Sequence, residues 1–250
     1  MELNLIDAAG VIALMRSEET RRPLCPTEKM SLDLMARLAE IGMIECGWPE
    51  EWPPDSAVKL TPGEGVAWRY DPSAPPEWAW HAYSITHLVT ASTDPETEPE
   101  RTEFWWRLAE AEAESYLSYQ LDRHRLNPRW ATEISKYFRS VGPLPIAEWR
   151  YCAWAAARRG AAEYLSSDGD AGATSHAVLN ELLWRARQIH SGAWSNMSFV
   201  PQQREPYTLI AQVFVQFVVP PGFDYWTSTP ADWSLERERS EPTVAANPSQ

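Results

Sequence analysis

Residues 38–45 read LAEIGMIE and residues 58–65 read VKLTPGEG, and these two stretches decide the fold prediction. The first is the end of a periodic apolar segment that predicts a helix over residues 28–41. Gly42 follows it, and glycine readily adopts the left-handed conformation in which many helices end. Apolar residues then begin an extended segment, and residues 57–60 predict a short strand that returns beside it.

A helix, a strand, a loop and a second strand in this order form a compact unit. We expect Ile44 and Leu60 to pair over the helix, and Thr61 to cap the segment that follows. The arrangement resembles the recognition-helix end and the wing of winged-helix proteins of the MarR and PadR type, over residues 4–70 only. The resemblance implies a winged-helix-like module in which residues 28–41 are the recognition helix.

The segments around this unit predict a mainly α protein. Residues 3–15 predict an amphipathic helix ahead of the candidate recognition helix. The prolines within residues 72–76 interrupt helices and strand ladders, so they predict a domain boundary. We therefore expect a winged-helix-like module over residues 1–72, a tryptophan-rich helical domain over residues 77–235 and a disordered tail over residues 236–250.

Most of the second predicted domain has helical periodicity. Residues 78–91 are apolar but ambiguous in period, and residues 93–100 predict an acidic, proline-containing loop. Residues 209–219 fit either a helix or a strand, since their β-branched side chains favour a strand. Helices are predicted over residues 101–122, 131–141, 145–165 and 174–190.

The composition limits the class of partner. The 250 residues carry a net charge of −13 and include 14 tryptophans, whose large rings require burial in a folded chain. The negative field repels nucleic acids and anionic membranes, which argues against a general nucleic-acid coat or a membrane-surface protein. It favours a partner protein with a basic surface. The sequence also contains no apolar run of about 18 residues, the length that a membrane-spanning helix needs.

The cysteines and the acidic clusters predict neither a metal nor a cofactor. Cys25, Cys46 and Cys152 are odd in number and widely spaced, which is typical neither of a zinc site nor of a disulfide framework. Buried free thiols suit a reducing cytosol, so we expect a cytoplasmic location. Of the three glutamates within residues 110–114, only Glu110 and Glu114 share a helix face. They have no histidine partner at metal-ligand spacing, so they predict a solvated face and not a metal site.

Four residues of the predicted module are candidates for partner binding. Trp48 and Trp52 lie in a proline-rich loop, and exposed tryptophans are favoured at protein interfaces. The alternative is that both rings fold back over the core of the module. Lys29 and Arg37 lie on the candidate recognition helix, which carries two basic and three acidic side chains. A helix that reads the major groove normally carries more positive charge, so we prefer a protein partner to DNA.

One stretch of the chain, residues 121–160, is basic and has aromatic residues interleaved, as in surfaces that bind single-stranded nucleic acid. The alternative is that its cations pair with the acidic loop at residues 94–100 and with the helix at residues 110–114. The candidate nucleic-acid-binding residues are Arg123, Arg125, Arg129, Lys136 and Arg139.

A catalytic alternative rests on Arg185 and His190, which have four residues between them on a predicted helix. The pair resembles the Arg-x4-His element of HEPN-type RNases, and the resemblance implies that arginine holds the phosphate while histidine transfers protons. The structural alternative is a surface arginine and a histidine that favours the C-terminal end of the helix dipole.

We therefore predict a non-enzymatic interaction or regulatory protein whose N-terminal module docks onto a partner protein. An accessory subunit of a bacterial multi-protein system, such as phage defence, would fit this description. The alternatives are a HEPN-like RNase that uses Arg185 and His190, and a dimeric DNA-binding transcriptional regulator in which Arg37 contacts the operator.

Overall fold

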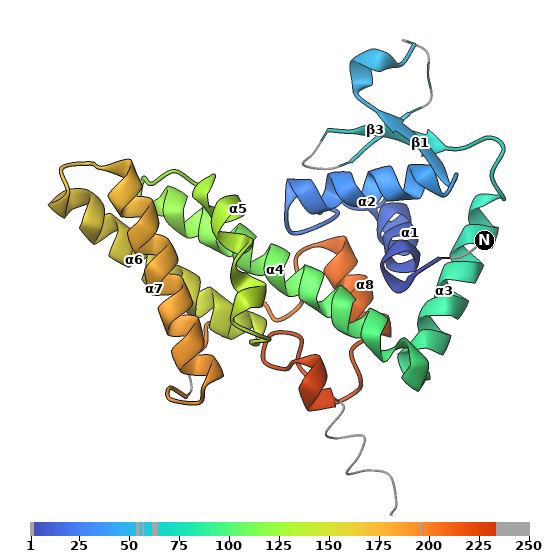
Figure 1. The fold of residues 1–250 in the computed structure, drawn as a ribbon. Coiled ribbons are helices and arrows are strands. Elements are labelled where there is room, and N and C mark those ends of the chain that lie inside the picture. Colours follow the sequence, from blue (N-terminus) through green and yellow to red (C-terminus); the bar gives the residue numbers. More distant parts are fainter. Residues whose placement is uncertain (1–2, 54–55, 57, 62–64, 196, 234–250) are drawn as a thin grey trace, which may run out of the picture.

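The computed structural model describes residues 3–53, 56, 58–61, 65–195 and 197–233, and it confirms a mainly helical fold (Figure 1). The predicted tail at residues 236–250 lies outside the described residues. The α-helices are α1 (Leu5–Ser17), α2 (Glu28–Glu40), α3 (Glu77–Thr93), α4 (Glu98–Arg123), α5 (Trp130–Ser135), α6 (Ile146–Ser166), α7 (Ala171–His190) and α8 (Leu209–Phe217). The strands are β1 (Ile44–Gly47), β2 (Lys59–Leu60) and β3 (Ala67–Tyr70).

Helix α1 lies at the centre of the N-terminal half. The Asn4 side chain accepts a hydrogen bond from the Asp7 amide, and the Asp7 carboxylate accepts one from the Asn4 amide, so both ends of a capping box are present. The helix packs against α2, α3 and α8 and is buried on nearly all sides. Its sequence therefore reads as apolar around most of its circumference, beyond the single stripe that a surface helix needs.

The small sheet has the strand order β1-β3-β2, and both pairings are antiparallel. The expected pairing of Ile44 with Leu60 is wrong, because β3, which the sequence analysis did not predict, lies between their strands. Ile44 pairs with Tyr70, and Leu60 pairs with Ala67. Gly42 leaves α2 at a φ of +72°, as expected.

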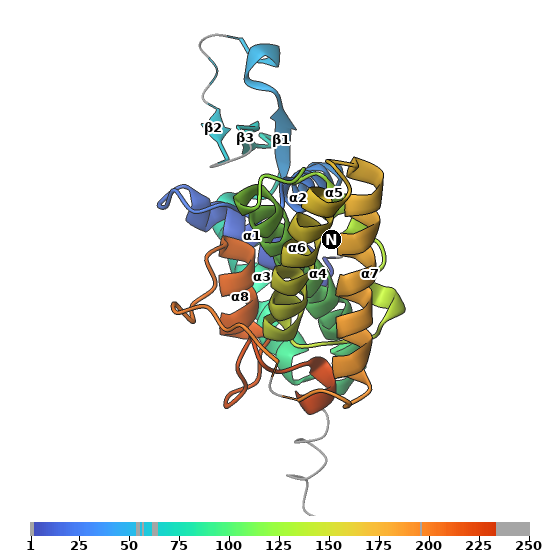
Figure 2. The same cartoon turned by 90° about the vertical axis from the view of Figure 1, so that its left-hand side faces the viewer.

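Thr61 closes the turn between β2 and β3 and does not cap a helix. Its hydroxyl accepts a hydrogen bond from the Val66 amide at 3.2 Å, and its own amide donates to the Val66 carbonyl at 3.0 Å. The sheet stands apart from the helical body, above α2 (Figure 2).

Residues 78–91 resolve into helix α3, whose buried residues Trp80, Ser84, Leu88 and Ala91 recur at helical spacing. The predicted acidic loop over residues 93–100 is wrong in its last part, because α4 begins at Glu98. Glu98 and Glu100 lie in the first turn of α4, where negative charge is favourable, and proline is tolerated there. The helix expected over residues 131–141 is α5 followed by a 3₁₀ turn at Phe138–Ser140.

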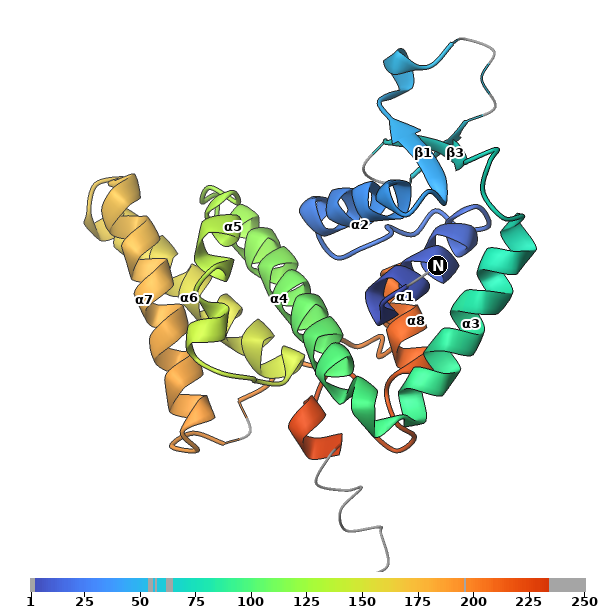
Figure 3. The ribbon, with the colours of Figure 1, turned by 45° about the vertical axis from the view of Figure 1, so that its right-hand side comes forward.

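Helix α4 connects two hydrophobic clusters (Figure 3). The first cluster joins α1, α2, the sheet, α3, the first half of α4, α8 and the aromatic residues near the end of the described chain. The second joins the second half of α4 to α5, α6 and α7. Packing of the first cluster therefore runs across the prolines of residues 72–76.

Residues 209–219, which fitted a helix or a strand, contain helix α8. Its first two amides donate to the Pro23 and Leu24 carbonyls at 3.1 and 3.0 Å, which fixes the start of the helix beside the segment that precedes α2. Within the described residues, none of the helices combines the length and the apolar character that crossing a membrane requires.

Candidate functional site

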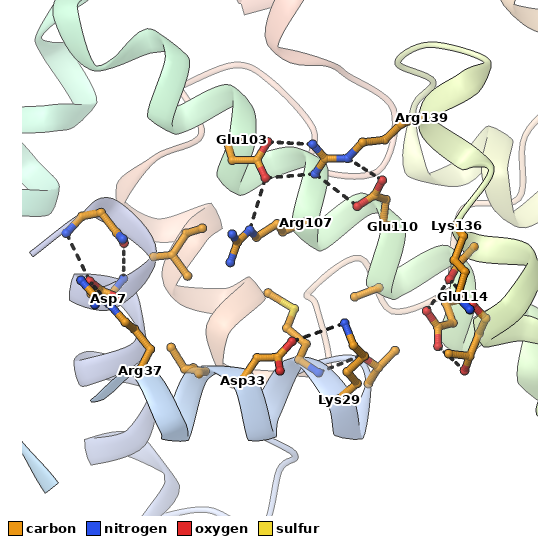
Figure 4. A pocket seen from close by; sticks show the side chains of 18 residues that line it. Asp7, Lys29, Asp33, Arg37, Glu103, Arg107, Glu110, Glu114, Lys136 and Arg139 are labelled. Atoms are coloured by element: carbon orange, nitrogen blue, oxygen red, sulfur yellow. Dashed lines mark hydrogen bonds and ion pairs between the residues drawn. The ribbon is translucent and has the colours of Figure 1, made fainter. Parts of the chain in front are cut away.

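A groove of about 830 Å³ separates α2 from α4 and α5 (Figure 4). It brings together Lys29 and Arg37, predicted as partner-binding residues, with Lys136 and Arg139, predicted as nucleic-acid-binding residues. No sequence pattern indicated that these two sets share one groove. Five basic and five acidic side chains line it, so its charge is balanced.

The α4 wall of the groove holds Arg139 in place. Glu103, Arg107 and Glu110 lie along one face of α4 at helical spacing. The Arg139 guanidinium pairs with Glu103 at 2.9 Å and with Glu110 at 2.7 Å (Figure 4). It also lies over the ring of Trp106. Hydrogen bonds from Arg139 lower the pKa of Glu103, and the two carboxylates raise the pKa of Arg139. The arginine is therefore neutralised by its own chain.

On the α2 wall, too, the cations are paired with carboxylates of the same chain. Arg37 pairs with Asp7 at 3.2 Å and with Glu40 at 2.8 Å, and these carboxylates raise its pKa. Lys29 lies 3.5 Å from Asp33 on the same helix. Across the groove, at the end of α5, Lys136 lies 2.6 Å from Glu133. A phosphate backbone would have to compete with these carboxylates for each cation.

Arg37 contributes to stability in a way that matters for any DNA-binding experiment. The Asp7 side chain is only 2% exposed, so removing Arg37 leaves a buried carboxylate without its counter-charge. We expect Arg37→Ala to lower the melting temperature measurably, whereas Lys29→Ala, at a side chain that is 75% exposed, leaves it unchanged. Thermal unfolding of both variants by circular dichroism checks this. Equal melting temperatures would contradict a structural role for the Arg37–Asp7 pair.

The two candidate anchor tryptophans have different surroundings. On the outer face of the sheet, away from α2, Glu45 pairs with Arg69 and Gly47 lies opposite Ala67. Trp52 folds back onto this face, with the Arg69 guanidinium 5.1 Å from its ring centre. Trp48 stays 46% exposed.

The remaining candidate nucleic-acid-binding residues lie away from the groove, at the end of α4. Arg123, Arg125 and Arg129 are exposed, and none forms an ion pair with another residue of the described chain. Arg123 lies over the ring of Tyr119, and Arg125 has a φ of +58° in the turn that ends α4. The five predicted residues therefore belong to two separate places. The predicted alternative, pairing with nearby acidic segments, describes Arg139 but not these three.

Arg185 and His190 both lie on α7, but in separate surroundings. Five residues along a helix turn the side-chain direction by about 140°, so the two side chains diverge. Arg185 donates to the Tyr151 hydroxyl at 2.6 Å and pairs with Glu181 at 2.5 Å. His190 is exposed, and its ring lies against Gly142, where an added Cβ would be 2.5 Å from the imidazole Cε1.

Sequence reasoning missed a buried polar cluster behind the groove. The sequence pattern separates Glu112 from the solvated face that Glu110 and Glu114 share, but it did not predict that Glu112 is buried. Two residues along a helix turn the side-chain direction by about 200°, so the spacing itself placed Glu112 opposite its neighbours. The Tyr225 hydroxyl donates to the Glu112 carboxylate at 3.5 Å, and burial raises the pKa of Glu112 to about 7. Burial beside Asp232 also raises the pKa of Glu148 to about 7.

No group of three or more histidine, cysteine or acidic residues in the described part of the chain is placed to hold a metal ion. Comparison of the chain with protein-family models, with curated proteins and with solved structures gives no match. The interpretation of these sites therefore rests on their geometry and chemistry.

Proposed function

We propose that this chain is a non-enzymatic interaction protein whose N-terminal module, winged-helix-like in the order of its elements, docks a partner protein through the outer face of its sheet. The observation that carries this proposal is the position of the sheet, which projects from the helical body (Figures 1 and 2). Large apolar side chains are exposed on it. Leu60 is 58% exposed on β2, and Trp48 is exposed just beyond β1.

The two side chains belong to the same end of the sheet. Leu60 and Gly47, the residue before Trp48, both pair with Ala67 of the central strand, so they lie in one row across the sheet. Exposed apolar side chains on a projecting edge are poorly explained by packing within the chain, and tryptophan is enriched among residues that dominate binding energy.

The charge around this face supports a partner with a basic surface. Glu50 and Glu51 are exposed in the short 3₁₀ turn between Trp48 and Trp52. Arg69, the cation on the outer face, is already paired with Glu45 at 2.6 Å. Carboxylates beside an apolar patch speed the approach of a basic partner and orient it.

The geometry favours docking of a partner protein over recognition of operator DNA. The cations of α2 line the groove and are paired with carboxylates of the same chain. A duplex would need those side chains free at the helix surface. The RNase alternative draws no support from the arrangement of Arg185 and His190, because each side chain is occupied by a different neighbour.

The proposal is tested with the full chain as bait in lysate of the source organism, with and without nuclease treatment. We expect a stoichiometric protein partner that survives nuclease, and we expect Leu60→Asp to weaken its binding at least about tenfold, as for a central interface residue. The matched control is Leu165→Asp, at an 82% exposed leucine at the end of α6. If both variants retained the partner, the sheet would not be the docking face. If nuclease released all the bound material, the proposal of a protein partner would be wrong.

A further inference from the structure

A cavity of about 390 Å³ lies on the side of α4 opposite the charged groove. Its walls come from the segment before α2, the middle of α4 and the residues just before α8. The hydrogen bonds from the first two amides of α8 to the Pro23 and Leu24 carbonyls hold two of these walls together. Because these amides are already bonded, the positive end of α8 offers them to no anion.

Two side chains of the cavity are buried with little hydrogen bonding. Glu112 is about nine-tenths buried, and its one side-chain partner shown is the Tyr225 hydroxyl at 3.5 Å. The Thr208 hydroxyl oxygen has no hydrogen-bond partner among the described residues, and that residue is 5% exposed. Buried polar groups are normally satisfied, so both point to a polar ligand group.

Arg150 is the cation that lowers the pKa of Glu112, but its guanidinium packs on aromatic rings. Arg150 of α6 stacks on Tyr116, with its guanidinium 3.9 Å from the ring centre, and it also lies over Trp226. It forms no ion pair with Glu112 within the described residues, and its Nε atom has no hydrogen-bond partner there. Arg150 lowers the pKa of Glu112, but the desolvation that raises it is the larger effect.

The lining of the cavity fits a cation. Glu28 and Glu112 line it, and none of the lysines, arginines or histidines in the described part of the chain does. Thr208 and Ser115 add hydroxyl oxygens that accept hydrogen bonds, while Pro23, Pro26 and Tyr207 supply apolar surface. A primary ammonium carries three N–H donors, and a carboxylate with two hydroxyls supplies four acceptor oxygens.

We propose that this cavity binds a small aliphatic primary amine in its ammonium form, with the ammonium at Glu112 and Thr208 and the alkyl chain against the prolines. An ionised Glu112 then gains a close counter-charge, which no ion pair within the described residues supplies. This site is independent of the sheet face proposed to dock a protein partner.

The test is isothermal titration of the full chain with putrescine, and with butanediol as a neutral analogue of the same length. We expect putrescine to bind and butanediol not to bind. Glu112→Gln removes the charge and Thr208→Val removes the hydroxyl at nearly constant size, and each is expected to weaken putrescine binding at least tenfold. Glu114→Gln, on the groove side of α4, is the matched control and leaves binding unchanged.

The pH dependence of binding supplies a second readout. Glu112 interacts with Arg150 and with the Tyr225 hydroxyl, and Arg150 lies over the ring of Tyr116. Glu28 and Cys25 line the same cavity. Since Glu112 must ionise to bind an ammonium, putrescine affinity should fall about tenfold from about pH 8 to about pH 6. The proposal would be overturned if butanediol bound as tightly as putrescine, or if Glu112→Gln bound putrescine as tightly as the wild type. It would also be overturned if millimolar putrescine gave no heat of binding.

Discussion

We expect Glu112→Gln to raise the free energy of unfolding by about 3 kcal/mol at about pH 8, because the substitution removes a charge that is costly to bury. Burial raises the pKa of Glu112 from an ordinary 4.5 to about 7 in the folded chain. The unfolded chain therefore releases this proton at lower pH than the folded chain does. The glutamine keeps an acceptor for the Tyr225 hydroxyl but carries no charge to desolvate.

The direction in which stability changes with pH distinguishes a buried carboxyl group from a solvated one. The folded carboxyl holds its proton between pH 4.5 and about 7, where the unfolded one has lost it, so this group lowers stability as pH rises through that window. Glu148, whose pKa is also raised to about 7, acts in the same direction. Urea unfolding at several pH values should show the wild type losing stability toward alkaline pH, with a flatter profile for Glu112→Gln. An unchanged profile would mean that Glu112 is solvated, and Glu114→Gln serves as the matched control.

The sequence predicted those parts of the fold that depend on neighbours along the chain. The mainly helical class and most helix positions followed from apolar periodicity, and the end of α2 at Gly42 followed from the conformational freedom of glycine. The two helix boundaries that failed, at Glu98 and near Val141, lie in proline- and turn-rich segments where local signals conflict.

Strand pairing and the arrangement of the candidate site could not be predicted in this way. The pairing of β3 with both other strands decides which residues face outward, and that choice depends on the packing of Trp68 against the helices. The groove depends on pairs that are distant in sequence, such as Asp7 with Arg37 and Glu103 with Arg139. Sequence reasoning named four of the cations in the groove, but it did not show that each one has a carboxylate partner.

Trp149→Ala is expected to lower the free energy of unfolding by about 4 kcal/mol, as for a fully buried aromatic ring that leaves a cavity. Trp149 is 1% exposed on α6, and its ring stacks on Phe138 with centroids 4.6 Å apart. The stack adds to the loss, because aromatic pairs contribute beyond their buried area. Trp78→Ala, at a ring that is 72% exposed on α3, is the control and should change stability little.

The same variant distinguishes two descriptions of how the chain is divided. Trp149 belongs to the cluster formed by α5, α6, α7 and the second half of α4, whereas α1 and α8 belong to the other cluster. If the clusters are the cooperative units, hydrogen exchange in Trp149→Ala should show lost protection in α6 and α7 while α1 and α8 stay protected. If the prolines of residues 72–76 mark the boundary instead, α3 and α8 lose protection together with α7, and α1 does not. The helices that open with α7 therefore show whether the boundary lies at these prolines or within α4.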